Sequence, residues 1–345
     1  MHILLCSSYP HLPDTRGGLQ TSTDELCLAL QDKGVQVTVL CGALAGPDGN
    51  DGTSVRRDVS LGYPVIRAAD PLEALPLVAA ALDPAAIIVQ SGYSLAAMLA
   101  VALETGCPTA VYLHNMELHR IGGTLPPDPA ILYIANSRFT AERWRALFGI
   151  APIILPPVVR PARYQVDRTG DRVLFVNPVP EKGIERVASL AAANPDVPFL
   201  IAESWQIGDE WRAWLRQRFG GIANVEWRPA TEDVRELFAD SRLLLMPSVW
   251  EEAYGRTVIE AQLSGLPVLA SSRGALVDTV GAGGLVLDVH ASVQEWSHAL
   301  RSLWDDGPAW RTASQAAVAH ARGEVRNGLR ALDDVLTRLA QHSAR

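Results

Sequence analysis

The chain has 345 residues, a net charge of −8 and four cysteines, which makes it long enough for two domains and too acidic for a typical nucleic-acid-binding protein. With 48% hydrophobic and 20% charged residues, it has the composition of a globular protein. Cys6, Cys27, Cys41 and Cys107 form no C-x-x-C pair, so we expect reduced core thiols in a cytoplasmic protein. We expect no signal peptide and no transmembrane segment, while peripheral contact with a membrane stays open.

The chain begins with the pattern of a Rossmann-like unit. Apolar residues predict strands at His2–Ser7 and Val35–Cys41, with a helix at about Thr21–Lys33 between them. No G-x-G-x-x-G motif is present. Instead, Gly17 and Gly18 precede the helix, where missing side chains let backbone N–H groups approach an anion closely. A flexible loop would also explain these two glycines.

A second candidate residue lies at the end of a later strand. The segments Ala86–Gln90, Thr109–His114 and Ile131–Ala135 predict three further strands of the same sheet. Ligands of an open parallel sheet bind beyond the carboxyl ends of its strands, which is where His114 falls. The alternative is a histidine that is hydrogen-bonded in a loop.

The second half of the chain repeats the plan of the first. Prolines concentrated at 152–168 stiffen the chain and exclude a helix, so we place the linker there. Beyond it, Arg172–Asn177 predicts a strand and Gly183–Ala193 a helix. The ammonium group of Lys182, in the turn between them, is placed to reach an anion such as a diphosphate. A lysine on the surface with no ligand is the alternative.

The most informative pattern runs from Pro247 to Leu269, PSVWEEAYGRTVIEAQLSGLPVL. Glu252 falls in a loop, a helix is expected to begin at Tyr254–Thr257, and Glu260 lies about one turn inside it. A helix N-terminus presents unpaired N–H groups and the positive end of its dipole, which suit a phosphate. Carboxylates beside it suit the hydroxyls of a ribose or a sugar. The pattern therefore indicates a nucleotide-sugar site, with solvated surface charges as the alternative.

The same stretch, in the form PSxxxExxGR…E…GLPV, resembles the E-x7-E signature of the retaining glycosyltransferases of family 4. The resemblance covers nearly the whole chain and is strongest over 241–278. It implies an α/β GT-B fold, with two Rossmann-like domains whose parallel sheets face each other across a central cleft. Residues 1–155 would form the acceptor side and 156–325 the donor side. Residues 326–345 would form a helix that packs back on the N-terminal domain.

The resemblance also implies roles for the candidate residues. Glu260 would bind the ribose hydroxyls and Glu252 the sugar hydroxyls, while His114 would contact the transferred sugar. Catalytic roles are thereby expected for His114, Glu252 and Lys182. The donor-binding residues would be Gly17, Gly18, Asn177, Arg228, Tyr254, Gly255, Arg256, Thr257 and Glu260.

One position departs from the family's pattern. Family members commonly carry an arginine five residues before the lysine, and this chain has Asn177 there. A diphosphate would need positive charge from elsewhere, for which Arg228 and Arg256 are the candidates, with Arg16 third.

We therefore expect a metal-independent retaining glycosyltransferase that needs no cofactor and no nucleic acid. Its donor would be a nucleotide-sugar, and its acceptor an unidentified hydroxyl in bacterial-type glycan or natural-product biosynthesis, on a glycan, a lipid-linked molecule or a secondary metabolite. The reaction would follow a front-face path with a diphosphate leaving group. Two alternatives remain: an epimerase on the same fold, and a catalytically weak binding or partner subunit. A dehydrogenase is disfavoured because neither half carries the dinucleotide fingerprint.

Overall fold

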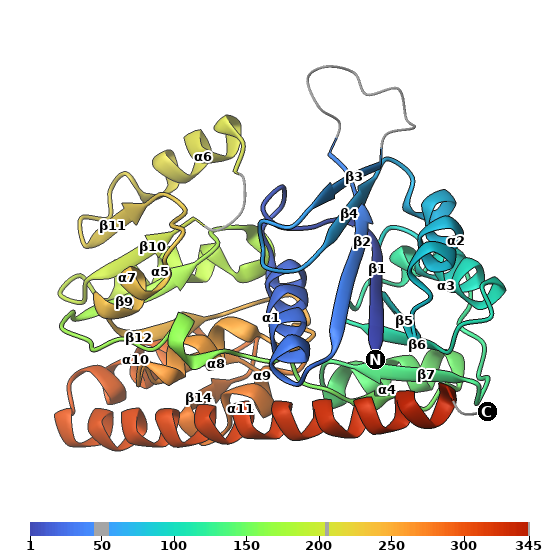
Figure 1. The fold of residues 1–345 in the computed structure, drawn as a ribbon. Helices are drawn as coiled ribbons and strands as arrows, with labels where there is room; N and C mark the ends of the chain where they lie inside the picture. Colours follow the sequence, from blue (N-terminus) through green and yellow to red (C-terminus); the bar gives the residue numbers. More distant parts are fainter. Residues whose placement is uncertain (45–54, 204–206, 344–345) are drawn as a thin grey trace. The chain divides into compact units, whose positions relative to one another are not determined.

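The computed structural model describes residues 1–44, 55–203 and 207–343, which form two compact units (Figure 1). The first unit comprises Met1–Val158 together with Asn327–Arg345, and the second comprises Val159–Arg326. The boundary at Val158 lies inside the proline-rich stretch. Each unit is an α/β layer structure around its own sheet, as the sequence predicts.

Within the described residues, an eight-stranded sheet of order β3-β4-β2-β1-β5-β6-β7-β8 forms the centre of the first unit. All neighbours pair in parallel except β3 and β4. The strands are β1 (His2–Pro10), β2 (Gln36–Gly42), β3 (Val55–Asp58), β4 (Val65–Ala68), β5 (Ala86–Gln90), β6 (Thr109–Leu113), β7 (Ile131–Ala135) and β8 (Ile153–Ile154). The helices are α1 (Gly18–Asp32), α2 (Pro71–Leu82), α3 (Leu95–Glu104) and α4 (Arg138–Phe148), with a 3-10 turn η1 (Leu118–Arg120).

The second unit contains a parallel sheet of six described strands in the order β11-β10-β9-β12-β13-β14. The strands are β9 (Arg172–Val176), β10 (Phe199–Ala202), β11 (Val225–Arg228), β12 (Ser241–Met246), β13 (Val268–Ser271) and β14 (Gly284–Leu287). The helices are α5 (Ile184–Ala193), α6 (Asp209–Phe219), α7 (Arg235–Ala239), α8 (Arg256–Leu263), α9 (Leu276–Val280) and α10 (Val293–Trp304), and the 3-10 turns are η2 (Pro161–Arg163), η3 (Pro180–Lys182) and η4 (Gly281–Gly283). The last helix, α11 (Gly307–Ser343), begins in the second unit, and its residues from Asn327 onward belong to the first.

Alternating side chains of β1 show why its sheet needs helices on both faces. Ile3 and Leu5 belong to one hydrophobic core, whereas Leu4 and Cys6 belong to another, and all four are fully buried. Successive residues of a strand point to opposite faces, so a continuous apolar run requires cover on each side. The second unit has the same arrangement, with its two cores containing Leu174 and Val173 respectively.

Helix α11 contributes to the cores of both units. Ala321 belongs to a core of the second unit, while Leu332, Val335 and Leu339 belong to a core of the first. Lys33, at the end of α1, also forms an ion pair with Asp333 of α11. The last part of α11 therefore completes a hydrophobic core of the first unit.

Each sheet has a point where the chain reverses the direction in which it adds strands. In the first sheet β1 lies between β2 and β5, and in the second β9 lies between β10 and β12. The loops that leave the two central strands there diverge, and a crevice opens at the carboxyl ends. The loops after β1 and β5, and those after β9 and β12, are therefore where a ligand is expected.

The structure refines several sequence-based boundaries. Helix α1 begins at Gly18, three residues before the expected Thr21, so the paired glycines form its N-cap and first residue. Trp211 and Trp214 stack at 4.3 Å between ring centroids on α6, a packing role. All four cysteines are unpaired. Among the described residues, no helix is long and apolar enough to cross a membrane.

Candidate functional site

An ion pair lies at the switch point of the second sheet. Lys182, at the end of η3 after β9, donates from Nζ to Oε1 of Glu252, in the loop after β12, at 2.6 Å. Ser248 Oγ donates to the same oxygen, also at 2.6 Å. The Lys182 and Glu252 side chains keep 20% and 10% of their exposure, so the pair is largely desolvated. Residues that are 70 positions apart are thus brought into direct contact.

Backbone bonds fix the loops that carry this pair. The N–H groups of Val249 and Trp250 both donate to the carbonyl of Glu181, which joins the loop after β12 to η3. The N–H of Ala275 donates to the carbonyl of Glu252, and a Cβ on Gly274 would lie only 2.2 Å from that oxygen. Three loops therefore meet so closely that the Glu252 backbone cannot shift freely.

The first turn of α8 follows immediately. Gly255 has φ of 85°, a left-handed conformation that glycine adopts readily, and a Cβ there would lie 2.6 Å from Leu276 Cδ2. The helix then begins at Arg256 and Thr257, while Tyr254 is 7% exposed and burial raises the pKa of its phenol. The sequence places the start of this helix correctly, and Gly255 is required by both φ and space.

Arg256 and Glu260 form a buried pair one turn apart on α8. Arg256 Nε donates to Glu260 Oε1, and its second guanidinium nitrogen donates to the Tyr164 hydroxyl at 2.8 Å. The guanidinium also lies over the Tyr164 ring, 5.5 Å from its centroid. Both charged side chains are about one-tenth exposed. Glu260 is therefore held in place by Arg256 before any ligand arrives.

Asn177 directly follows β9 at the same edge of the sheet. It is 4% exposed and has φ of 69°, a left-handed conformation that asparagine tolerates better than most residues. Its backbone N–H donates to the carbonyl of Ala202, whereas its buried side-chain Oδ1 has no hydrogen-bond partner among the described residues. An orphaned buried acceptor costs free energy unless a donor reaches it.

Arg228 is not brought into this group of side chains. It ends β11 at the edge of the sheet and pairs with Glu226 at 2.8 Å and with Asp240 at 2.6 Å. Two carboxylates already compensate its charge. Its expected donor-binding role remains a prediction, and a ligand anion would have to compete with both carboxylates.

His114 in the first unit follows β6 and is 6% exposed. Its Nε2 lies 3.1 Å from Gln90 Oε1, the amide oxygen that also accepts from Thr23 Oγ1 at 2.8 Å. Because an amide oxygen only accepts, Nε2 carries a proton in this contact. Burial lowers the pKa of His114 to about 3. Through Gln90 the structure links His114 to α1.

The N-terminus of α1 lies on an anchored loop. Gly17 has an extended φ of −176° and makes no side-chain cap, and a Cβ on Gly18 would meet no atom within 4 Å. Arg67 of β4, 1% exposed, donates to the carbonyls of His11 and Leu12 and pairs with Asp14. The fold itself therefore does not require glycine at 18, while the loop before it is firmly held.

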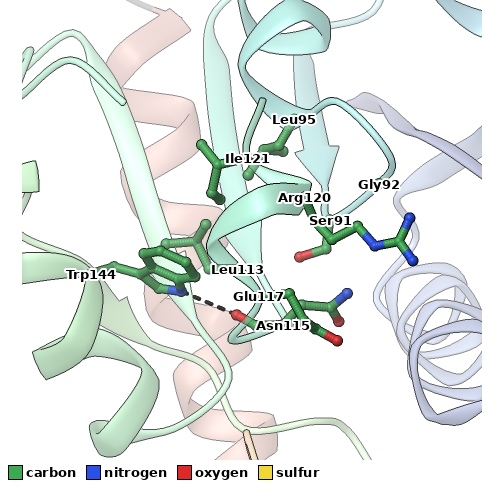
Figure 2. A pocket seen from close by; sticks show the side chains of 9 residues that line it. All are labelled: Ser91, Gly92, Leu95, Leu113, Asn115, Glu117, Arg120, Ile121 and Trp144. Atoms are coloured by element: carbon green, nitrogen blue, oxygen red, sulfur yellow. Dashed lines mark hydrogen bonds between the residues drawn. The ribbon is translucent and has the colours of Figure 1, made fainter. Parts of the chain in front are cut away.

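A small pocket opens at the carboxyl ends of β5 and β6 (Figure 2). One part of its lining is apolar, with Trp144 the largest side chain. Figure 2 shows Asn115, Glu117 and Arg120 grouped on the side away from Trp144. The Trp144 indole donates to the carbonyl of Asn115 at 3.2 Å, which fixes the start of this loop. The complete lining is Ser91, Gly92, Leu95, Leu113, Asn115, Glu117, Arg120, Ile121 and Trp144.

Sequence reasoning missed the partners that hold these residues. Ser248 stands within the quoted motif, and its place four residues before Glu252 was the available signal. Gln90 is a polar residue at the end of the apolar strand β5, which also marks it, whereas Thr23 stands among other polar residues of α1 and carries no such signal. Tyr164 carries no local signal, because only the tertiary fold places it against Arg256. Among the described residues, no group of three or more His, Cys, Asp or Glu side chains could hold a metal ion.

Two family models match consecutive parts of the chain. "Glycosyltransferase Family 4" matches residues 16–163, and "Glycosyl transferases group 1" matches residues 170–306. Together they leave little of either unit unmatched. The chain belongs to the family 4, group 1 glycosyltransferases.

Solved structures agree in fold. HepE from Anabaena in complex with UDP-glucose is 17% identical, with a TM-score of 0.78 over 98% of this chain and 100% of that one. Sucrose-phosphate synthase from Thermosynechococcus elongatus is 16% identical, with a TM-score of 0.77 over 98% of each chain. AviGT4, a glycosyltransferase involved in avilamycin A biosynthesis, is 21% identical with a TM-score of 0.66. These likenesses show that the two units are those of the GT-B fold.

Curated relatives share part of their length with this chain. D-inositol 3-phosphate glycosyltransferase of Mycobacterium sp. (strain KMS) is 29% identical over 258 residues, which are 68% of this chain and 57% of that protein. The enzyme of the same name from Mycobacterium tuberculosis (strain F11) is 28% identical over 260 residues, 53% of its length. The chain thus spans little more than half of these relatives.

Proposed function

We propose that this protein is a retaining glycosyltransferase that moves a sugar from a nucleoside-diphosphate sugar to an acceptor hydroxyl. The observation that carries the proposal is the Lys182–Glu252 pair at the switch point of the second sheet, beside the first turn of α8. It supports the proposal because a cation, a carboxylate and a helix N-terminus match a diphosphate linked to a hydroxylated ring. Family membership of the chain adds the reaction class.

In the proposed arrangement, the second unit binds the donor. The diphosphate lies against Lys182 and the N-terminus of α8, and the Glu260 carboxylate accepts from the ribose hydroxyls. Glu252 Oε1 already accepts two hydrogen bonds, so the remaining oxygen is the one proposed for the sugar hydroxyls. The orphaned Oδ1 of Asn177 accepts one further donor group from the ligand. Arg256 acts by holding Glu260 rather than by meeting the diphosphate.

In the first unit, we propose that His114 contacts the sugar as a neutral imidazole and that the start of α1 at Gly18 contacts a phosphate. The depressed pKa keeps His114 uncharged at neutral pH, so its imidazole can hydrogen-bond a sugar without adding charge. Gly18 leaves the first turn of α1 uncovered, which suits a phosphate group.

The proposed chemistry is a front-face substitution. The acceptor oxygen bonds to the anomeric carbon on the face from which the diphosphate departs, and the bond from that carbon to the phosphate oxygen breaks. The departing phosphate oxygen takes the acceptor's proton, so no carboxylate acts as a nucleophile. The protein stabilises the charge that develops on the diphosphate and orients the two substrates. The proposal includes no cofactor and no divalent ion.

A ligand screen tests this function. Thermal unfolding would be measured with UDP, GDP, TDP, ADP and CMP, beginning with UDP because the HepE structure contains UDP-glucose. A nucleotide at about 100 times its Kd should stabilise the fold by about 2.7 kcal/mol. Donor turnover, the anomeric configuration of the product, and activity after chelation then test the remaining steps. If no nucleotide stabilised the protein, the nucleotide-sugar donor would be contradicted. If chelation abolished activity and Mg²⁺ restored it, the metal-independent mechanism would be contradicted.

One observation favours a second candidate, a binding subunit with weak catalysis. Asn177 supplies no positive charge where the family commonly has an arginine, and Arg228 and Arg256 are both paired with carboxylates. Such a protein would bind the nucleotide and show no turnover with any acceptor. An epimerase would convert the donor sugar without an acceptor, which product analysis distinguishes.

A further inference from the structure

His114 is held from several sides within the first unit. Its backbone N–H donates to Ser91 Oγ at 3.0 Å, and its carbonyl accepts from Asn136 Nδ2 at 3.1 Å. Its ring packs on that of Tyr112, with 3.9 Å between the centroids, and the Tyr112 hydroxyl donates to the Leu155 carbonyl at 2.7 Å. The backbone and the ring are therefore fixed in place, and the remaining variable is which ring nitrogen carries the proton.

The amide of Gln90 decides the position of that proton. Gln90, the last residue of β5, and Thr23 of α1 are both buried. The amide oxygen accepts from Thr23 Oγ1 at 2.8 Å and lies 3.1 Å from His114 Nε2. Because the Thr23 hydroxyl donates to this oxygen, the oxygen rather than the NH₂ group of the amide faces the imidazole. An oxygen only accepts, so His114 carries its proton on Nε2.

The other ring nitrogen of His114, Nδ1, remains for a ligand. It makes no hydrogen bond within the part of the chain that the structure describes. Burial lowers the pKa of His114 to about 3, so near neutral pH the ring holds one proton, which is the one on Nε2. Nδ1 then carries a lone pair and no proton. It can accept a hydrogen bond from a ligand and can donate none.

This lone pair sets a chemical requirement on the sugar. A sugar hydroxyl can donate its proton to Nδ1, whereas a hydrogen or a fluorine in place of that hydroxyl cannot. A site that is built to hydrogen-bond a substrate hydroxyl discriminates against the analogue that lacks it, because its own polar group is then left unpaired. The discrimination depends on Gln90 and Thr23, although both act only through His114.

We propose that Gln90, oriented by Thr23, is a positioning residue that fixes His114 in its Nε2–H form, so that Nδ1 selects donor sugars whose hydroxyl donates to it. The inference rests on the proposed glycosyltransferase function, in which His114 contacts the transferred sugar. It adds two positioning residues to that function and states which hydrogen-bonding group the sugar presents to the imidazole.

The first test determines the tautomer of His114 without any ligand. Proton–nitrogen correlation spectra of the folded protein show which ring nitrogen of each histidine is protonated, and H114Q assigns the signals of His114. We expect Nε2–H in the wild-type protein. T23V removes the donor that orients Gln90, and Q90M removes the acceptor oxygen, so each should give a mixture of both tautomers. The control is T38V, which deletes the hydroxyl of another buried threonine in the same unit and should leave the His114 signals unchanged.

The second test measures dissociation constants by calorimetry for UDP-glucose and for its monodeoxy and monodeoxyfluoro analogues. At one hydroxyl position, the wild-type protein should bind both analogues ten-fold or more weakly than UDP-glucose, which is about 1.4 kcal/mol. In Q90M and T23V the ring can present an N–H at Nδ1, which fluorine accepts, so the deoxyfluoro analogue should bind more tightly than the deoxy analogue at that position. T38V should bind the two equally, whereas a merely structural loss would weaken all analogues by the same factor.

Two outcomes would overturn this inference. An Nδ1–H ring in the wild-type protein, or an unchanged tautomer in both T23V and Q90M, would exclude the positioning role. If no position showed a different preference between the deoxy and deoxyfluoro analogues in wild type and Q90M, the requirement for a donating hydroxyl would be wrong. Stabilisation by UDP is measured in parallel. If UDP stabilises the protein while these comparisons fail, only this inference falls. If neither UDP nor UDP-glucose binds while the tautomer responds as expected, the UDP-sugar donor is wrong and the positioning of His114 stands.

Discussion

The contact between Lys182 and Glu252 allows a double-mutant cycle that separates stability from activity. K182M leaves the Glu252 carboxylate with Ser248 alone, and E252Q leaves the Lys182 ammonium beside a neutral amide. The double variant K182M/E252Q contains neither charge and nearly preserves both shapes. We expect it to recover most of the stability that either single change removes, and none of the activity.

The size of the recovery follows from the burial of the pair. A hydrogen bond between charged groups contributes about 1.5–3 kcal/mol, and breaking a fully buried pair costs about 3–5 kcal/mol. These side chains retain 20% and 10% exposure, so we expect about 2 kcal/mol of coupling. At roughly 2–4 °C per kcal/mol for a unit of this size, that is a difference of about 4–8 °C in Tm.

The assay combines thermal unfolding with release of nucleoside diphosphate from the donor that the nucleotide screen identifies. All three variants should lose at least about 2 kcal/mol in kcat/KM, roughly thirty-fold, because the diphosphate loses its cation or the sugar its carboxylate. If the double variant regained activity along with stability, the pair would be purely structural. A coupling energy below about 0.5 kcal/mol would refute the reasoning from burial.

Three other changes test the remaining elements. G18A should leave the fold at least as stable, since an added methyl meets open space and alanine favours helix by about 0.5–1 kcal/mol, yet it should weaken nucleotide binding; an unchanged nucleotide Kd would exclude a phosphate at α1. E260Q retains a hydrogen-bond acceptor for Arg256, so the expected fall in nucleotide affinity of about ten-fold would reflect lost contact with the ribose. The affinity is measured by calorimetry on folded protein, and an unchanged affinity would exclude Glu260 as the ribose-binding residue. For His114, the folded pKa of about 3 lies below the unfolded value of 6.5, so the unfolded state binds more protons between them and acidification from about pH 6.5 towards pH 3 destabilises the fold. H114Q should remove up to about 1.4 kcal/mol per pH unit of that slope in denaturant titrations, and an unaltered slope would contradict the burial of a neutral ring.

The fold was largely predictable because its signals are local and repeated. Apolar runs such as Thr109–Leu113 and Ile131–Ala135 mark strands buried on both faces, and the alternation with helical stretches indicates parallel sheets. The antiparallel strand β3 (Val55–Asp58) was missed because its four residues include three charged side chains and little apolar periodicity. Helix α1 was predicted three residues short because glycine is normally read as loop.

The candidate site was predictable only as far as single positions. Lys182 and Glu252 were each singled out, but nothing local shows that an ion pair joins them across 70 residues. Arg256 was expected to face a diphosphate, whereas its surroundings depend on Tyr164, 92 positions away. Burial and pairing arise from tertiary packing, so the chemical type of a residue could be read from the sequence and its electrostatic state could not.

The discontinuity of the first unit has a consequence for synthesis of the chain. A ribosome delivers Met1–Val158 long before Leu332, Val335 and Leu339, which complete a core of that unit. Until then the apolar surface that they cover remains exposed, and such surfaces promote aggregation and chaperone binding. The second unit contains its whole sheet within one continuous segment, so it can fold as soon as that segment has emerged. The unit that begins first during translation is therefore the one that finishes last.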